Sequence, residues 1–307
     1  IGAGPTAWPG VSPTSALTTN GSYNVTVYVT DPYGSAVNMT NTVTVIDRAL
    51  SVYGGLDSAS DTGVSNTDGI TRDNTPSFFG WVTEGGSIVA VYASLNGGSP
   101  NLIGTTTADA AGAWSFTPAT ALADGGYTIS AQAFDAGGQT ISDLATVRSG
   151  LVIDTVGPRI TDVQLDGWRG QVIVTFNDYG GVADVGSGLL ASAVRDANNY
   201  VFTKLLAKNT NLRPWLVTSI SVSPGTTTGE QVATIQFNGG AQIRGGKYLF
   251  QVLSAAAANL SGIRDVAGNA LNGEFYGYFP SGNNVNGGNF VANLDAIHHT
   301  VYPAKTQ

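Results

Sequence analysis

The feature that most constrains the fold is a two-residue alternation of side-chain character, which recurs along the chain. Tyr23, Val25, Val27 and Val29 stand at every second position of one segment, and residues 127–133 repeat the pattern with Tyr, Ile and Ala. Successive side chains of a β-strand point to opposite faces, so this period is typical of half-buried strands. The alternation therefore predicts a chain built mainly from β-strands.

Composition indicates that these strands are short and joined by tight turns. The 307 residues include 41 glycines, and the segments between clusters of Gly, Asn and Asp are rich in Val, Thr, Ile and Tyr. Hydrophobic residues make up 42% of the chain and charged residues only 11%, against about 25% charged residues in ordinary domains. The length and the apolar content predict two or three domains with sizeable cores.

Charge and cysteine usage exclude several classes of function. The net charge of −8 disfavours a nucleic-acid or anionic-membrane partner. No run of 18 apolar residues occurs, so the sequence predicts no membrane-spanning helix. Cysteine is absent, which leaves packing or metal ions to hold an extracellular chain together. The chain begins "IGAGPTAWPG" without Met, and we expect it to be a piece of a longer protein.

The first predicted domain covers residues 1–48 and is a partial one. "SYNVTVYVT" and "NTVTVID" are expected to form two strands around the turn "DPYG", because Pro suits the second turn position. One hairpin cannot bury a face alone. The run of alternating Val before "TD" resembles the closing strands of PKD-type or cadherin-like modules. This resemblance implies the last strands of a β-sandwich.

The second predicted domain, residues 49–157, contains strands at short and regular spacing. Examples are "SIVAVYASL", "AWSFTP" and "YTISAQAFD", and this spacing is typical of an all-β sandwich. The motifs "DTGVSNTDGITRDNTPSFFGWV", "TADAAGAWSFTP", "ALADGGYTISAQAFDAGG" and "VIDTVGP" follow one another in order. Together they resemble the bacterial Ig-like repeat of giant adhesins and biofilm-associated surface proteins. The resemblance implies a Greek-key sandwich at the surface of a bacterium.

The third predicted domain covers residues 158–282, and residues 283–307 are expected to be a Gly/Asn-rich linker or tail. "PRITDVQLDGWRGQVIVTFND" predicts a strand, a turn and a second strand, whereas "LLASAVRDANNYVF" predicts one short helical turn. The motif "GGKYLFQV" followed by "GIRDVAGNALNG" resembles the Ig-like domain of S-layer-type surface proteins. The whole chain is thus predicted to be tandem Ig-like β-sandwiches arranged as beads on a string.

Aspartates concentrate in the stretch "DTGVSNTDGITRDNTP", residues 61–76. Calcium takes six to eight oxygen ligands, and Gly and Asn between the carboxylates permit the turns that bring carbonyls toward an ion. The candidate ligands are Asp57, Asp61, Asp68 and Asp73. The alternative is a solvated loop in which Asp and Asn cap turns.

A second acidic group is predicted at the border between the second and third domains. Asp154 lies in "VIDTVGP" at the border, and the loop "NDYGGVADVGSG" contributes Asp178 and Asp184. A calcium ion held by these three residues would stiffen the hinge, whereas the alternative is an ordinary polar linker. Asp265, in "RDVAGN", is expected to cap a turn.

Catalysis finds little support in the sequence. The only histidines, His298 and His299, are adjacent in the predicted tail, where no core would orient an imidazole for acid–base work. We therefore expect no enzymatic activity.

The sequence predicts a structural, adhesive stalk segment of a large bacterial cell-surface or secreted protein, with calcium as its cofactor. Its expected partners are neighbouring domains of the same chain and copies of itself, joined by strand pairing into a filament. The alternative is a non-catalytic module of a secreted polysaccharide- or protein-degrading enzyme. In that alternative, Trp168 and Trp215 would bind cell-surface or matrix glycans from one exposed face.

Overall fold

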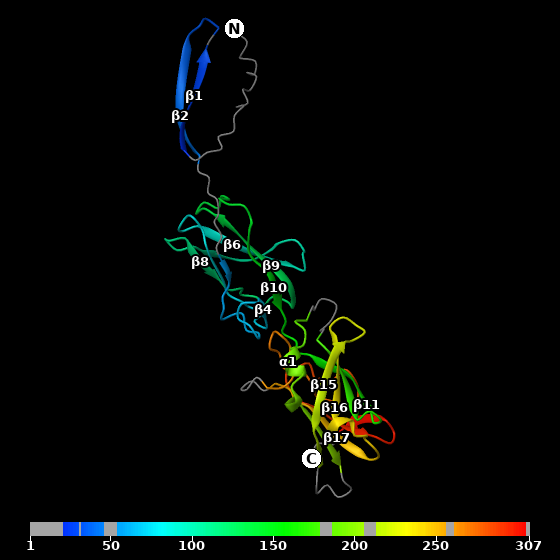
Figure 1. Cartoon of the computed structure of the whole chain (residues 1–307). Coiled ribbons are helices and arrows are strands. Elements are labelled where there is room, and N and C mark those ends of the chain that lie inside the picture. The colour runs from blue at the N-terminus through cyan, green and yellow to red at the C-terminus, as the bar shows by residue number, and fades with distance from the viewer. Residues whose placement is uncertain are drawn as a thin grey trace.

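The computed structural model describes residues 21–30, 32–45, 54–178, 186–205, 213–255 and 261–304. These residues form two β-sandwiches and one hairpin, with only short helical turns, which confirms the predicted all-β class of tandem Ig-like sandwiches. Figure 1 shows the two sandwiches following one another along the chain.

The hairpin consists of β1 (Gly21–Thr30) and β2 (Ala36–Val45). They pair antiparallel from Gly21 opposite Val45 to Thr30 opposite Ala36, with the "DPYG" turn between them. The hairpin expected from the alternation is therefore present. Residues 1–20 and 46–53 lie outside the described residues, so the partial sandwich of residues 1–48 stays a prediction.

The first sandwich, residues 54–153, packs a three-stranded sheet on a five-stranded one. The small sheet has the order β3-β5-β8 and the large sheet β4-β10-β9-β6-β7. The strands are β3 (Gly54–Leu56), β4 (Ile70–Thr71), β5 (Phe78–Trp81), β6 (Ile88–Leu95), β7 (Asn101–Thr107), β8 (Ala113–Phe116), β9 (Gly125–Phe134) and β10 (Ala145–Ile153).

The core of the first sandwich lies between these two sheets. Phe78 and Trp114 from the small sheet meet Val91, Ile129 and Leu151 from the large one in a single buried cluster. Residues of β9 alternate between buried and partly exposed over most of the strand. The alternation in the sequence thus identified the buried face correctly.

The second sandwich, residues 159–303, packs a four-stranded sheet, β11-β12-β16-β15, on a five-stranded sheet, β14-β13-β17-β18-β19. Its elements are β11 (Arg159–Asp166), β12 (Gln171–Asn177), α1 (Ala191–Val194), η1 (Ala197–Asn199), β13 (Tyr200–Leu205), β14 (Arg213–Trp215), β15 (Val217–Pro224), β16 (Glu230–Phe237), η2 (Asn238–Gly240), β17 (Lys247–Val252), β18 (Phe290–Asp295) and β19 (Thr300–Pro303). The expected helical turn is present as α1 and η1.

The prediction of a linker or tail over residues 283–307 is wrong for residues 290–303. β18 pairs with β17 from Phe290 opposite Val252 to Asp295 opposite Lys247, and β19 extends the sheet. Phe290, Ala292 and Leu294 are fully buried in the second core. The sequence did not predict these two strands, because they follow a Gly/Asn-rich stretch and contain too few apolar residues to show a long alternation.

Candidate metal site at the junction between the sandwiches

The two sandwiches meet where β10 ends and a five-residue segment, residues 154–158, leads into β11. Asp154 is the first residue of this segment and is fully buried. Its Oδ2 accepts a hydrogen bond from the backbone N–H of Ser187 at 2.6 Å, and its Oδ1 accepts one from Val156 at 3.1 Å. The carboxylate is therefore held in one orientation at the border of the domains.

Two loops of the second sandwich bring further carboxylates to the same place. Asp178 follows β12, is buried, and accepts a hydrogen bond from the N–H of Gly188 at 2.6 Å. Asp265 is fully buried in the loop after β17, where its Oδ1 accepts from the N–H of Asn269 at 2.7 Å. The Nδ2 of Asn269 donates to its Oδ2 at 2.9 Å.

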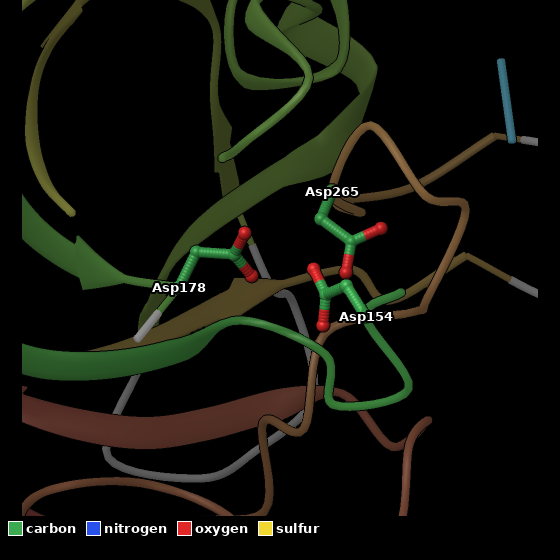
Figure 2. Close-up of side chains that lie close together, drawn as sticks. All are labelled: Asp154, Asp178 and Asp265. Carbon is green, nitrogen blue, oxygen red and sulfur yellow. The ribbon is translucent and has the colours of Figure 1, made fainter. Parts of the chain in front are cut away.

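Figure 2 shows the three carboxylates of Asp154, Asp178 and Asp265 turned toward one another. Each offers an oxygen, and these three oxygens lie within 4.8 Å of one another. We name these residues the aspartate triad. In the described parts of the chain it is the one group of three or more His, Cys, Asp or Glu side chains with this proximity.

The electrostatics of the triad oppose three negative charges in the absence of a cation. Burial, and to a smaller extent the neighbouring charge of Asp154, raise the pKa of Asp265 to about 7, although the hydrogen bonds from Asn269 and Gly268 act in the opposite direction. A buried carboxylate loses its hydration, and a like charge nearby adds repulsion, so the protonated form is favoured.

The chemistry of the donors fits a hard cation. The triad supplies carboxylate oxygens alone, without imidazole or thiolate, and such a set suits calcium or magnesium rather than zinc. Calcium needs six to eight oxygens at about 2.3–2.6 Å, so backbone carbonyls or water would complete its shell. A buried group of carboxylates that already receive oriented hydrogen bonds is arranged for this role.

Two asparagines hold the segment 154–158 against the second sandwich. Asn269 donates from Nδ2 to the carbonyl of Asp154 at 2.8 Å, and Asn286 donates to the carbonyl of Thr155 at 2.7 Å. Asn286 also accepts from the N–H of Gly157 at 2.7 Å. A side chain at Gly157 would collide with the carbonyl of Ala270, so this close approach of two backbones requires glycine.

The Asp-rich loop of residues 57–76 also reaches the second sandwich. The N–H of Val64 donates to the carbonyl of Val266 at 3.0 Å, and the guanidinium of Arg72 donates to the carbonyl of Gly268 at 3.0 Å. Both acceptors belong to the loop that carries Asp265. The loop therefore contacts the junction through its backbone and Arg72.

The four predicted calcium ligands of this loop occupy separate turns. Asp57, Asp68 and Asp73 each accept from a backbone N–H two residues ahead, at 2.9 Å, which is the turn-capping geometry that the alternative interpretation describes. These aspartates are not members of the aspartate triad. A calcium site built from them stays a prediction.

Asp61 differs from the other three aspartates because it is buried. Its Oδ2 accepts from the N–H of Gly69 at 2.9 Å, whereas Oδ1 meets no hydrogen-bond donor among the described residues. Burial raises the pKa of Asp61, with a smaller contribution from the charge of Asp68. Among the described residues, its Oδ1 is thus the one buried carboxylate oxygen of the Asp-rich loop without a hydrogen-bond partner.

The predicted junction site is partly assembled in the structure. Asp154 and Asp178 come together as expected, and Asp184 lies outside the described residues. Asp124 stands beside the segment and accepts from the Thr155 hydroxyl at 2.9 Å. The third member, Asp265, was expected only to cap a turn. That expectation is incomplete, because its carboxylate caps Asn269 and also faces Asp154. The cue in the sequence was "RDVAGN" itself, in which an Asp precedes an amide donor by four residues.

The two tryptophans of the alternative prediction lie in different surroundings. The Trp168 side chain is 78% exposed in the turn between β11 and β12. Trp215 packs against the second core, with its ring 6.1 Å from Phe202 and 5.8 Å from Tyr248 in edge-on contacts. Trp215 is therefore a packing residue, and the expected single exposed face is wrong.

The first sandwich has a recognisable family. Residues 50–155 match the family described as bacterial Ig-like domain. This match covers the first sandwich and ends at the junction that holds Asp154. It confirms the bacterial Ig-like resemblance over that part of the chain, and it favours a protein of the bacterial surface. No curated protein matches the chain.

Two solved structures are similar to the chain at 19% identity. One is the tetra-tandem repeat in the extending region of a large adhesion protein, with a TM-score of 0.28 over 82% of this chain and 55% of that one. The other is a Ca2+-stabilised adhesin that helps an Antarctic bacterium reach out and bind ice, with a TM-score of 0.26 over 81% of this chain and 55% of that one. This chain thus spans about half the length of either structure.

No helix in the described residues is long and apolar enough to cross a membrane.

Proposed function

We propose that this chain is a spacer segment in the stalk of a bacterial surface protein, and that calcium bound by the aspartate triad fixes the angle between its two sandwiches. The observation that carries the proposal is the convergence of Asp154, Asp178 and Asp265 at the junction. The match of residues 50–155 to the bacterial Ig-like domain supports the surface location.

The junction supports a mechanical role because the segment that leaves the first sandwich and two loops of the second sandwich both contribute carboxylates. Asp154 belongs to the connecting segment, and the other two carboxylates belong to loops of the second sandwich. An ion that ligates all three would tie the segment to the second sandwich. Without the ion, the burial of the carboxylates and the repulsion from Asp154, which together raise the pKa of Asp265, favour a looser junction.

Calcium titration of the thermal unfolding temperature tests this proposal, with EDTA as the reference state. Binding to the folded state alone stabilises it by about 2.7 kcal/mol at a hundredfold excess over Kd. The increase should be lost in Asp154→Asn and Asp265→Asn and retained in Asp135→Asn. Asp135 is a suitable control because it caps a turn through Gly137 and Gln139 and lies outside the triad.

The same samples distinguish the triad from the Asp-rich loop. If Asp61→Asn abolishes the calcium response and Asp154→Asn leaves it intact, the ion belongs to the loop of residues 57–76. An unchanged unfolding temperature at millimolar calcium in the unmodified chain would refute the metal site. Small-angle scattering with EDTA and with calcium then tests stiffness, since a fixed junction narrows the distribution of interdomain distances.

Three finer elements belong to this proposal. The second sandwich, which runs beyond the predicted end at residue 282 to residue 303, is taken as an S-layer-type Ig-like domain, and residues 1–48 as the end of a PKD-type or cadherin-like module. The hairpin β1–β2 is a two-stranded sheet in the described structure, and edge strands of this kind can pair with another chain. Filament formation predicts a molar mass that rises with concentration in light scattering. A constant monomer mass at high concentration would refute it.

A further inference from the structure

Three turns converge at the end of the second sandwich that is remote from the junction. They are residues 167–170 between β11 and β12, residues 241–246 before β17, and residues 296–299 between β18 and β19. β11 starts beside the junction and contains 8 residues, so at about 3.3 Å per residue the turns lie roughly 25 Å away. We name this end the distal pole.

Backbone hydrogen bonds hold the three turns together. The N–H of Ile243 donates to the carbonyl of Gly167 at 2.9 Å, and the N–H of Ala296 donates to the carbonyl of Gly246 at 3.0 Å. The three turns are therefore held in place by the strands of the second sandwich, as binding loops commonly are.

A pocket of about 260 Å³ opens between these turns. Trp168, Gln242, Arg244 and His299 contribute its large polar and aromatic side chains, and Ile243 and Ala296 contribute apolar surface. The volume lies just below the range of roughly 300–1,000 Å³ that is typical of ligand pockets. It suits one sugar-sized ring.

The guanidinium of Arg244 is oriented by its neighbours. Its Nε donates to the Oε1 of Gln242 at 2.5 Å. The backbone carbonyl of Arg244 accepts from the Tyr248 hydroxyl at 3.2 Å and from the Nζ of Lys204 at 3.5 Å. No described residue accepts from the two terminal nitrogens, which leaves the fork that binds a carboxylate in bidentate fashion.

Trp168 and His299 also line the pocket. The indole of Trp168, 78% exposed, offers an apolar face with a polar edge. His299 adopts a positive φ of 53° in the β18–β19 turn, a conformation that is uncommon outside glycine and that recurs at functional sites.

We propose that the pocket at the distal pole binds the carboxylate-bearing ring of an acidic polysaccharide. The apolar C–H face of the sugar stacks on Trp168, the carboxylate pairs with the terminal nitrogens of Arg244, and the amide of Gln242 contacts a ring hydroxyl. The chain as a whole carries a charge of −8, but Arg244 brings a positive charge to the lining of this pocket, and the Nζ of Lys204 lies 3.5 Å from the Arg244 carbonyl. The site would make the second sandwich an adhesive unit as well as a spacer.

The test is an NMR titration of the full chain with trigalacturonate, in EDTA and at physiological salt. Maltotriose serves as the neutral probe and inorganic phosphate as the small-anion probe. We expect trigalacturonate to shift the indole N–H signal of Trp168 and to leave that of Trp81 in place. Arg244→Gln, which loses the charged partner, should weaken binding about tenfold or more. Trp168→Ala, which loses the stacking face, should weaken it to a similar degree, as followed by the backbone N–H signals of the other lining residues.

Matched variants separate the site from general effects. Trp81→Ala and Arg195→Gln remove an exposed tryptophan and an exposed arginine elsewhere and should leave the affinity unchanged. Equal binding of maltotriose would overturn the acidic class of ligand. Full displacement of trigalacturonate by phosphate would overturn the sugar-binding proposal and leave a simple anion site. If trigalacturonate shifts no signal of the unmodified chain, the proposal is overturned without any variant.

Discussion

The response of stability to pH gives the sharpest test of the aspartate triad. The pKa of Asp265 is raised from its ordinary value of 3.8 to about 7, first by burial and then by the charge of Asp154. A raised carboxylate pKa means that the folded state holds its proton more tightly than the unfolded state. The contribution of Asp265 to the free energy of unfolding is therefore fully present below pH 3.8 and is lost as the pH rises through about 7.

The size of this loss follows from the two pKa values. At about 1.36 kcal/mol for each pKa unit, the difference between 3.8 and about 7 corresponds to roughly 4 kcal/mol. In EDTA, the free energy of unfolding of the second sandwich should therefore fall by up to that amount between about pH 4 and pH 7.5. Calcium should oppose this fall, because carboxylates must be ionised to ligate a metal.

Urea unfolding at a series of pH values, with Asp265→Asn beside the unmodified chain, measures the effect. Asn keeps an acceptor for the N–H of Asn269 but loses the acceptor for its Nδ2, which costs about 1 kcal/mol at every pH. The variant should thus show a constant offset and a flatter pH profile in EDTA. Identical pH slopes for the two proteins in EDTA would refute the reasoning, since the other titrating groups are common to both.

Three further changes probe the junction and the second core. Asn269→Ala removes the donor to Asp154 and Asp265 in a buried site; we expect a loss of about 1–3 kcal/mol in urea unfolding and a weaker calcium response, and an unaltered unfolding curve would contradict this. Gly157→Ala forces a collision with the carbonyl of Ala270; it should broaden the interdomain distances seen by scattering while each sandwich stays folded, and an unchanged scattering profile would show that the close approach is unimportant. Phe290→Ala empties a fully buried position in β18 and should cost about 3–5 kcal/mol; a cost below 1 kcal/mol would restore the linker interpretation of this segment, and Tyr33→Ala, in the exposed hairpin turn, is the control.

Much of the fold could be predicted from local sequence patterns. The rest depends on contacts between distant segments of the chain. The alternation of Tyr127, Ile129 and Ala131 located β9 because its side chains face the core of the first sandwich directly. β19 has only four residues and lies at a sheet edge, where no long apolar period can develop. Short edge strands of this kind depend on pairing rather than on their own propensity.

The candidate site divides in the same way. Asp154 could be identified from its place at a domain border, and Asp178 from a Gly-rich loop. From "RDVAGN", Asp265 could be identified only as a turn cap, because its proximity to Asp154 depends on the second sandwich bringing a loop after β17 next to the segment after β10. For the Asp-rich loop, local composition shows that carboxylates are dense but not that Asp57, Asp68 and Asp73 each cap a turn of their own, and the calcium site predicted there stays a prediction.

Because the Asp-rich loop contacts the second sandwich, a mechanical force can pass between the two sandwiches along two routes. One is the covalent segment 154–158, and the other runs from Val64 and Arg72 to the loop of Val266 and Gly268. Inside the first sandwich, β4 lies parallel to β10, with Ile70 opposite Val152 and Thr71 opposite Ile153. A pull on the two ends of this sandwich slides these parallel strands lengthwise, so their hydrogen bonds are strained together rather than opened one by one. A bending force at the junction must break the contacts of Val64 and Arg72 with the loop of Val266 and Gly268 before the second sandwich can swing about the covalent segment.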